Sequence, residues 1–178
     1  APGVKPEVLT AQKRAEALKS APRVGIESPT LVGSISLVGA RLDDLVLKQY
    51  GQTVEVNSER IHLLHPSGAP KSYFAEFGWV GGSDSPNLPG PTTIWSSDGK
   101  QLTPGQPVTL SWDNGAGLKF ERTYSLDEGY MVTVTQKVIN TGETPTALFP
   151  YGLIARSGTP DTLGFYILHE GPLGVFDG

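Results

Sequence analysis

The chain has 178 residues, of which 38% are hydrophobic and 18% are charged, so it can build one packed domain and disorder is not indicated. A formal net charge of −4 at pH 7 and a single basic pair, Lys13-Arg14, argue against a nucleic-acid-binding surface. The absence of cysteine excludes disulfides, thiolate catalysis and cysteine-ligated zinc. No stretch of the sequence approaches the roughly 20 apolar residues that cross a bilayer.

The first predicted element is a helix over residues 6–20. Pro6 near its start costs little, because the first helical positions have no N–H partner to lose. We expect the helix to dock weakly or to fray, because its apolar stripe is thin and consists of Val8, Ala11, Ala15 and Leu18. Ala21-Pro22 ends it, since a residue before proline is pushed out of helical geometry. Residues 1–22 are therefore expected to form a helical lead-in or linker.

From residue 23 onward almost every signal indicates β structure. Ile35 and Leu37 alternate with Ser34 and Ser36, which is the period of a strand with one buried face. Most of the 22 glycines and 15 prolines fall between such runs, as in a domain of short strands joined by turns. Strands are predicted over residues 24–27, 31–38, 42–50, 61–64 and 72–80. The segment 83–92, which contains three prolines, is expected to be a surface loop.

The second half of the chain predicts strands with short connections, over residues 108–112, 118–126, 130–139 and 147–155. Val108, Leu110 and Trp112 alternate with polar residues, and residues 113–117 make the turn of a hairpin. Three consecutive long strands with short connections predict an antiparallel meander. Arg122 is the exception on the apolar face, and we expect it to reach a strand edge or a partner carboxylate. No domain boundary is evident after about residue 24.

The histidines are the first candidates for chemistry, and the sequence contains three, His62, His65 and His169. In a strand, positions three apart face opposite sides, so His62 and His65 would not easily share one metal ion. We therefore expect one surface histidine and one turn histidine. His169-Glu170 resembles a strand end, where adjacent side chains point apart, so acid–base chemistry is not favoured there.

The remaining candidates are a carboxylate pair and a group of aromatic residues. Asp43-Asp44 is interpreted as a solvated or turn-forming pair instead of a catalytic one. The aromatic group could line a sugar platform or a peptide groove, but a core layer is favoured; it consists of Tyr73, Phe74, Phe77, Trp79, Trp95 and Trp112. Neither a Gly-x-Ser-x-Gly elbow nor a phosphate-binding glycine loop is present. We therefore predict no catalytic, cofactor-binding or metal-binding residue, and the partner-binding residues stay unassigned.

Several motifs occur in the same order as in a known family. They are residues 22–29 (PRVGIESP), 33–50 (GSISLVGARLDDLVLKQY), 73–80 (YFAEFGWV), 123–130 (TYSLDEGY) and 138–145 (VINTGETP). Over roughly residues 22–178 the sequence resembles the large, first periplasmic domain of the YidC/Oxa1 family of membrane protein insertases, in its alphaproteobacterial form. Residues 33–50 and 73–80 carry the more specific part of the resemblance.

The resemblance implies a mainly β fold over residues 23–178, an antiparallel β-supersandwich of the galactose-mutarotase-like type, with a short N-terminal helix. It implies a non-catalytic domain of an insertase and chaperone that helps to insert and fold inner-membrane proteins, with or without the Sec translocon. The implied partners are the Sec translocon with its auxiliary components and nascent inner-membrane proteins, without nucleic acid or cofactor. The implied location is the periplasmic side of the bacterial inner membrane, with tethering spans absent from this sequence. The family's activity resides in transmembrane helices, so no active residue carries over.

The ends of the sequence lead to further expectations. Because residue 1 is Ala and the only methionine is Met131, we expect an excised or processed piece without a signal peptide. The family continues past Gly178 with more strands, so the domain is expected to be truncated at its C-terminal end. A missing edge strand would leave an exposed edge or favour swapping.

The implied fold is related to that of galactose mutarotases, which suggests an alternative function. The chain would then be a carbohydrate-binding or aldose-epimerase-like β-sandwich. Epimerases of that fold use a histidine and a glutamate across a cleft. The histidines of this sequence stand in a different context, so we expect no mutarotase activity.

Overall fold

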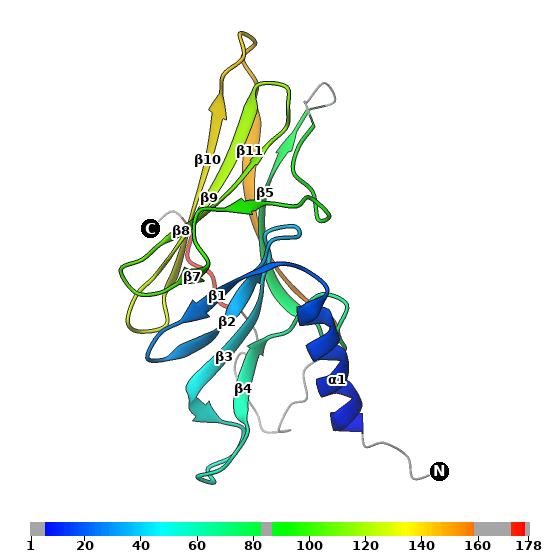
Figure 1. The fold of residues 1–178 in the computed structure, drawn as a ribbon, viewed down its shortest axis with the longest axis vertical. Helices are drawn as coiled ribbons and strands as arrows, with labels where there is room; N and C mark the ends of the chain where they lie inside the picture. The colour runs from blue at the N-terminus through cyan, green and yellow to red at the C-terminus, as the bar shows by residue number, and fades with distance from the viewer. Residues whose placement is uncertain (1–5, 83–86, 159–171, 177–178) are drawn as a thin grey trace.

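The computed structural model of the chain describes residues 6–82, 87–158 and 172–176, with side chains from residue 12 onward (Figure 1). Helix α1 (Pro6–Lys19) is followed by β1 (Arg23–Glu27), β2 (Leu31–Ser36), β3 (Leu42–Gly51), β4 (Arg60–Leu64) and β5 (Tyr73–Gly81). Then come β6 (Ser96–Ser97), β7 (Gln101–Leu102), β8 (Val108–Asp113), β9 (Leu118–Leu126), β10 (Val132–Asn140) and β11 (Leu148–Arg156). The predicted mainly β fold with one short N-terminal helix is confirmed.

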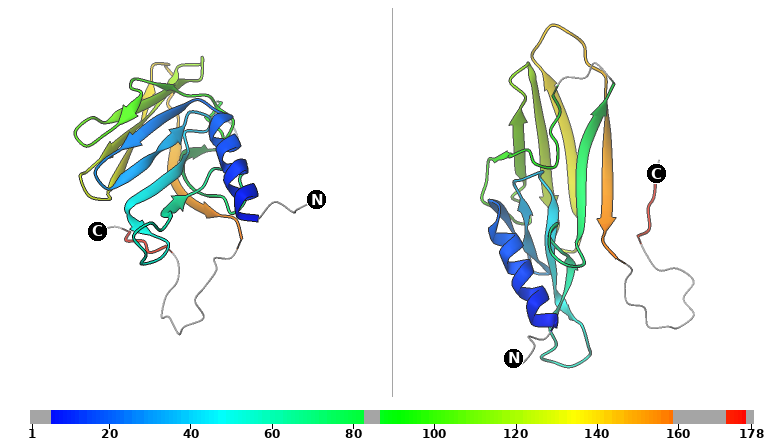
Figure 2. Two further views of the ribbon diagram at one scale, coloured as in Figure 1. Left: turned by 60° about the horizontal axis from the view of Figure 1, so that its bottom comes forward. Right: turned by 90° about the vertical axis from the view of Figure 1, so that its right-hand side faces the viewer.

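In this part of the chain the strands form two sheets, which pack against each other as a sandwich (Figures 1 and 2). The larger sheet has seven strands in the order β11-β5-β3-β2-β1-β7, with β4 also paired to β3, and the smaller has the order β10-β9-β8-β6. The pairings are antiparallel except between β1 and β7, which run parallel. The short strands β6 and β7 were not predicted from the sequence.

The antiparallel meander is confirmed for β8, β9 and β10, but the prediction that residues 147–155 continue it is wrong. β11 pairs instead with β5 in the larger sheet, from Leu148↔Gly81 to Arg156↔Tyr73. The connection over residues 141–147 is long enough for the chain to change sheets. Pro150 has no N–H to donate, and an edge strand such as β11 is where a sheet accepts it.

The core lies between the two sheets, and strand alternation supplies it. In β9 every second side chain is buried, and in β1 the inward residues Val24 and Ile26 are at most 2% exposed. Trp79 of β5 crosses the interface and meets Phe120 of β9 edge-on, with ring centroids 5.1 Å apart. Burying this apolar surface is the main stabilising contribution to the sandwich.

Helix α1 agrees with the predicted span and lies outside the sandwich, alongside β4 on the larger sheet (Figures 1 and 2). After the helix, the carbonyl of Pro22 accepts a hydrogen bond from the Leu37 amide at 2.9 Å, which ties the chain to the end of β2. Within the residues described, no helix is long and apolar enough to cross a membrane.

Candidate functional site

The acidic pair of the sequence is buried within β3, so the prediction of a solvated turn is wrong. Asp43 is 4% exposed and Asp44 is 8% exposed. The pairing of β2 with β3 changes register after Ser34, which lies opposite Asp44, while Ile35 lies opposite Leu42. Asp43 is thus the extra residue of a β-bulge, and a bulge interrupts the alternation that would send two successive side chains to opposite faces.

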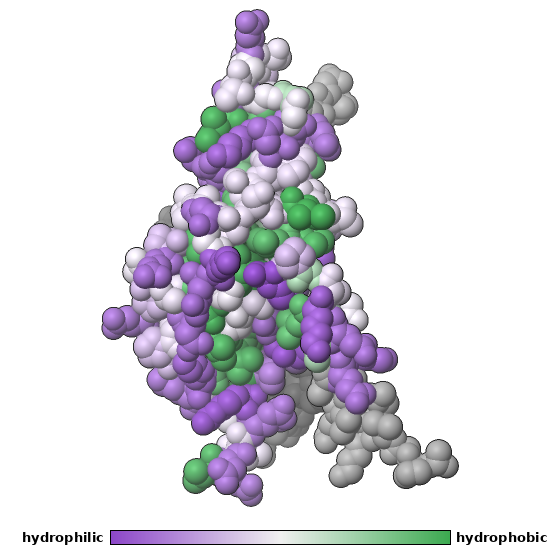
Figure 3. Space-filling model, in the orientation of Figure 1, coloured by the Kyte–Doolittle hydropathy of each residue, from purple (hydrophilic) through white to green (hydrophobic). Residues whose placement is uncertain are grey.

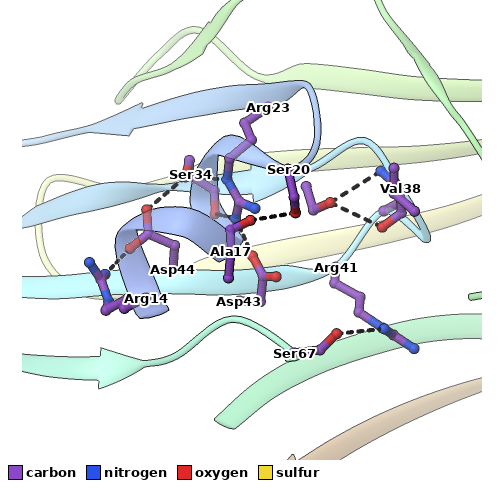
Figure 4. Close-up of polar contacts among 12 residues, drawn as sticks. Arg14, Ala17, Ser20, Arg23, Ser34, Val38, Arg41, Asp43, Asp44 and Ser67 are labelled. Carbon is purple, nitrogen blue, oxygen red and sulfur yellow. Dashed lines mark hydrogen bonds and ion pairs between the residues drawn. The ribbon is translucent and has the colours of Figure 1, made fainter. Parts of the chain in front are cut away.

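Each carboxylate of the pair is bound by an arginine (Figure 4). Arg23 of β1 donates to Asp43, and Arg14 of α1 donates to Asp44. Ser34 links the two pairs, since its hydroxyl donates to Asp44 and accepts from Arg23 Nε, both at 2.7 Å. Burial raises the pKa of Asp43, and the charge of Arg23 opposes that rise. We call these five residues the polar clasp.

The clasp is suited to holding elements together and not to proton transfer. Both carboxylates are already engaged by a guanidinium, and a general base must be free to reach its substrate. A small hollow of about 140 Å³ lies beside it, lined by residues of α1, the end of β2 and the segment after β4. There Arg41 donates to Ser67 at 3.1 Å (Figure 4) and to Glu76 at 2.6 Å, so this guanidinium is also held by protein groups.

The structure brings together two of the histidines that the sequence assigned to opposite sides. The rings of His62 and His65 have centroids 5.7 Å apart, so the predicted separation is wrong. β4 ends at Leu64, and His65 pairs only as an isolated bridge with Tyr73, so strict strand alternation does not extend across the pair. His169 and Glu170 lie outside the described residues. Within the described part, no three His, Cys, Asp or Glu side chains are grouped as a metal site.

Arg122 has partners other than the strand edge or carboxylate that the sequence predicted. It is 2% exposed and donates to the main-chain carbonyls of Gly39 at 3.1 Å and Ala40 at 3.2 Å. Its guanidinium stacks on Trp95 at 4.4 Å and Trp79 at 5.4 Å from the ring centroids. Desolvation lowers the pKa of Arg122, which still stays charged at physiological pH. Arg122 therefore joins the smaller sheet to the turn between β2 and β3.

The aromatic group is divided between the core and the surface of the sheet. Trp79 and Trp95 are 6% and 2% exposed, so the predicted core role is confirmed for both. Trp112 and Tyr73 are half-buried and pack against the core. Phe74 lies beneath the guanidinium of Arg41, 4.8 Å from its ring centroid. A sugar platform needs exposed ring faces side by side, and these rings do not present them.

Two long strand edges are open in the part of the chain that the structure describes. β11 ends the larger sheet and β10 ends the smaller one, and each pairs with a strand on one side only. The opposite edges, β7 and β6, are two residues long. An open edge presents N–H and C=O groups to any extended segment that approaches it.

The open edge of β11 also carries exposed apolar side chains. Phe149 is 64% exposed and lies opposite Val80, which is 53% exposed, while Leu153 on the same face is 46% exposed. The face seen in Figure 3 differs, because hydrophilic residues prevail on it and apolar residues form separate patches. No sequence pattern indicated that β11 forms an edge, because the order of strands in a sheet is a tertiary property.

Between the edges of β10 and β11 the sandwich leaves a cavity of about 250 Å³. Its lining combines apolar side chains with polar atoms and consists of Trp79, Leu118, Val138, Asn140, Thr146, Leu148 and Pro150. Typical small-molecule sites occupy roughly 300–1,000 Å³, so this cavity suits a single side chain better than a cofactor. An extended segment lying along either edge could place one apolar side chain there.

Comparison with known proteins gives one family. A family model described as YidC periplasmic domain matches residues 23–178. A membrane protein insertase YidC of Methylorubrum extorquens (strain PA1) is 50% identical over 165 residues, which cover 93% of this chain and 27% of that protein. The insertase YidC of Methylobacterium radiotolerans is 50% identical over 178 residues, covering 98% and 28%.

A relative with lower sequence identity also belongs to the YidC insertases. The membrane protein insertase YidC of Paracoccus denitrificans is 44% identical over 199 residues, which cover 99% of this chain and 31% of that protein. The chain thus spans between 27% and 31% of the length of these relatives.

Proposed function

The chain belongs to the YidC periplasmic domain family, and from this premise we propose that it serves a membrane protein insertase as an interaction module without catalysis of its own. The domain faces the periplasm from the bacterial inner membrane. The proposal of a non-catalytic role is supported by the chemistry of the described polar groups. The buried carboxylates are held by arginines, and the buried Arg122 is held by carbonyls.

The single observation that carries the proposed interaction is the open, apolar edge of β11. A polypeptide in extended conformation would add to this edge by main-chain hydrogen bonds, which do not depend on its sequence. Phe149 and Leu153 would contact its side chains on one face of the sheet. Such binding suits clients that share little sequence and pass while still unfolded.

The proposed occupants of this edge are nascent inner-membrane proteins and components of the Sec translocon, including its auxiliary subunits. Nascent chains bring extended segments with apolar side chains. A Sec component would bring a strand or loop of its own to the same groups. The insertase names of the relatives support the first class of partner, and the second is our proposal alone.

Site-specific photo-cross-linking in the intact insertase tests this function. A benzophenone amino acid replaces Phe149, and the control replaces Glu128, which is exposed in the turn between β9 and β10. We expect the probe at position 149 to form adducts with a stalled inner-membrane protein or with a Sec component, and the probe at 128 to form few. Adducts confined to the insertase's own chain, or equal yields at both positions, would contradict the proposal.

The absence of catalysis has a separate test. We expect the optical rotation of freshly dissolved α-D-glucose to relax at the same rate with and without the chain. Among the described residues, His62 lies close to a glutamate, with its Nε2 3.6 Å from Oε1 of Glu59. Faster relaxation that disappears in His62→Gln would show that the sugar-acting alternative is correct.

A further inference from the structure

A weakly exposed ion pair joins helix α1 to the larger sheet. Arg14 makes the one ion pair between α1 and the sheet among the described side chains, and its partner is Asp44 of β3. The two side chains are only 16% and 11% exposed, so water screens the pair weakly. Arg14 Nε is buried and has no hydrogen-bond partner in the described part of the chain.

His62 lies opposite Val46 in the pairing of β4 with β3, two positions along β3 from Asp44. The charges of Arg14 and Asp44 act on both histidines, and the charge of Glu59, from the segment before β4, acts on His62. His62 Nδ1 is buried without a partner among the described residues.

On its other side, His65 contacts Tyr73 of β5 through main-chain hydrogen bonds of 2.8 and 3.0 Å. The Arg23–Asp43 pair lies beside the Arg14–Asp44 pair and is joined to it through Ser34.

We propose that protonation of His62 and His65 releases helix α1 from the sheet, so that the helix acts as a pH-sensitive latch. Each proton adds a positive charge beside Arg14, which weakens the attraction that holds the helix. A protonated imidazole also competes with Arg14 for the carboxylate of Asp44. This inference concerns the attachment of α1 and does not depend on what binds the edge of β11.

The electrostatics give the direction of the switch. Burial, followed by the charge of Arg14, lowers the pKa of both histidines below the ordinary 6.5, while Asp44 opposes the shift at both and Glu59 opposes it at His62. The attached state therefore binds fewer protons than the released state. The stability of the attached state relative to the released state is therefore greatest above the ordinary pKa of histidine. It is lost as the pH falls through the lowered pKa values of the two histidines.

Single-molecule energy transfer in the chain tests the latch directly. The chain has no cysteine, so Gln12→Cys on α1 and Lys100→Cys beside β7, both exposed, are the only labelled sites. We expect one population at about pH 7.5 and a second, with a different transfer efficiency, that grows as the pH falls below 6.5. Unchanged tryptophan emission over this range shows that the sandwich stays folded.

The variants separate the latch from general acid effects. The double variant His62→Gln, His65→Gln should keep one population at both pH values, and Arg14→Gln should lose the pH response. Lys13→Gln, which alters the exposed neighbour of Arg14, should respond as the unmodified chain does. A single population of the unmodified chain at both pH values, or an unaltered response of the double variant, would overturn the proposal.

A second measurement applies if the histidine variant does not fold. Histidine titration by NMR should then show the pKa values of both imidazoles higher in Arg14→Gln than in the unmodified chain, because the charge of Arg14 lowers both. Equal values in the two proteins would also overturn the proposal.

Discussion

Arg122 shows how one residue can fix the relation between two sheets. The turn that it holds contains Gly39 and Ala40, both with positive φ, at 73° and 50°. An alanine in this region is strained, so the turn needs support from outside. Arg122 and the hydroxyl of Tyr124, which donates to Ala40 at 2.9 Å, provide that support from β9.

We predict that Arg122→Met lowers the free energy of unfolding by about 2–4 kcal/mol, because the carbonyl of Gly39 is left buried without its donor and Trp95 loses its stacked cation. Urea denaturation followed by tryptophan emission measures the effect. Lys137→Met is the control, since this side chain is 63% exposed and its replacement should change the value by less than about 0.5 kcal/mol. Equal midpoints for the two variants would show that Arg122 does not support the turn.

The contacts of individual residues were hard to predict from the sequence, because their partners lie far away along the chain. Alternation in residues 118–126 identified Arg122 as an anomaly on an apolar face, and Trp79 and Trp95 were correctly predicted as core. The partners of Arg122 are main-chain carbonyls more than 80 positions away, and no side-chain pattern reports them. Asp43 and Asp44 were placed in water because a bulge has no sequence period.

At the scale of elements, the contact between β2 and β3 determines where the polar clasp forms. The backbone of Gly33 in β2 lies very close to the backbone of Asp44 in β3. A Cβ at position 33 would overlap the carbonyl oxygen of Asp44 and lie 2.8 Å from the carbonyl carbon of the same residue. Glycine is required there for close approach of two strands. The bulge and the carboxylate of Asp44 both depend on this spacing.

We therefore predict that Gly33→Ala destabilises the chain by about 1–3 kcal/mol or more, because β3 must move and carry Asp44 away from Arg14. Thermal unfolding followed by circular dichroism measures the loss. Gly82→Ala is the matched control, since a Cβ there would meet no atom of the described residues within 4 Å. A melting temperature of Gly33→Ala as high as that of Gly82→Ala would be inconsistent with the close packing of β2 on β3.

Elements of more than four residues were predicted well, and shorter ones were not. The ends of the helix and the long strands lie within two residues of their predicted positions, because each displays several turns or pleats of its period. β6 and β7 have two residues each, too few for any period, and they form only because β8 and β1 offer them edges. The pairing of β11 with β5 likewise follows from the packed sandwich and not from the order of the strands.

In the molecule as a whole, the sandwich has a buried apolar core and two long unpaired strand edges, β10 and β11, in the described part of the chain. The fold class and the family were correctly inferred from the sequence, through motifs that the domain shares with its relatives. The division into residues 1–22 and 23–178 and the absence of site residues stay predictions. The edge of β11 could not be predicted as a binding surface, because exposure and strand order emerge only when both sheets are assembled.

The proposal that this edge receives extended polypeptides can be tested most directly by hydrogen exchange of the intact insertase, with and without a stalled inner-membrane client. Main-chain pairing protects amides, so we expect slower exchange in Leu148–Arg156 when the client is present. Exchange in the buried strand β9 should not change. Equal exchange of β11 with and without the client would show that no extended polypeptide pairs with this edge.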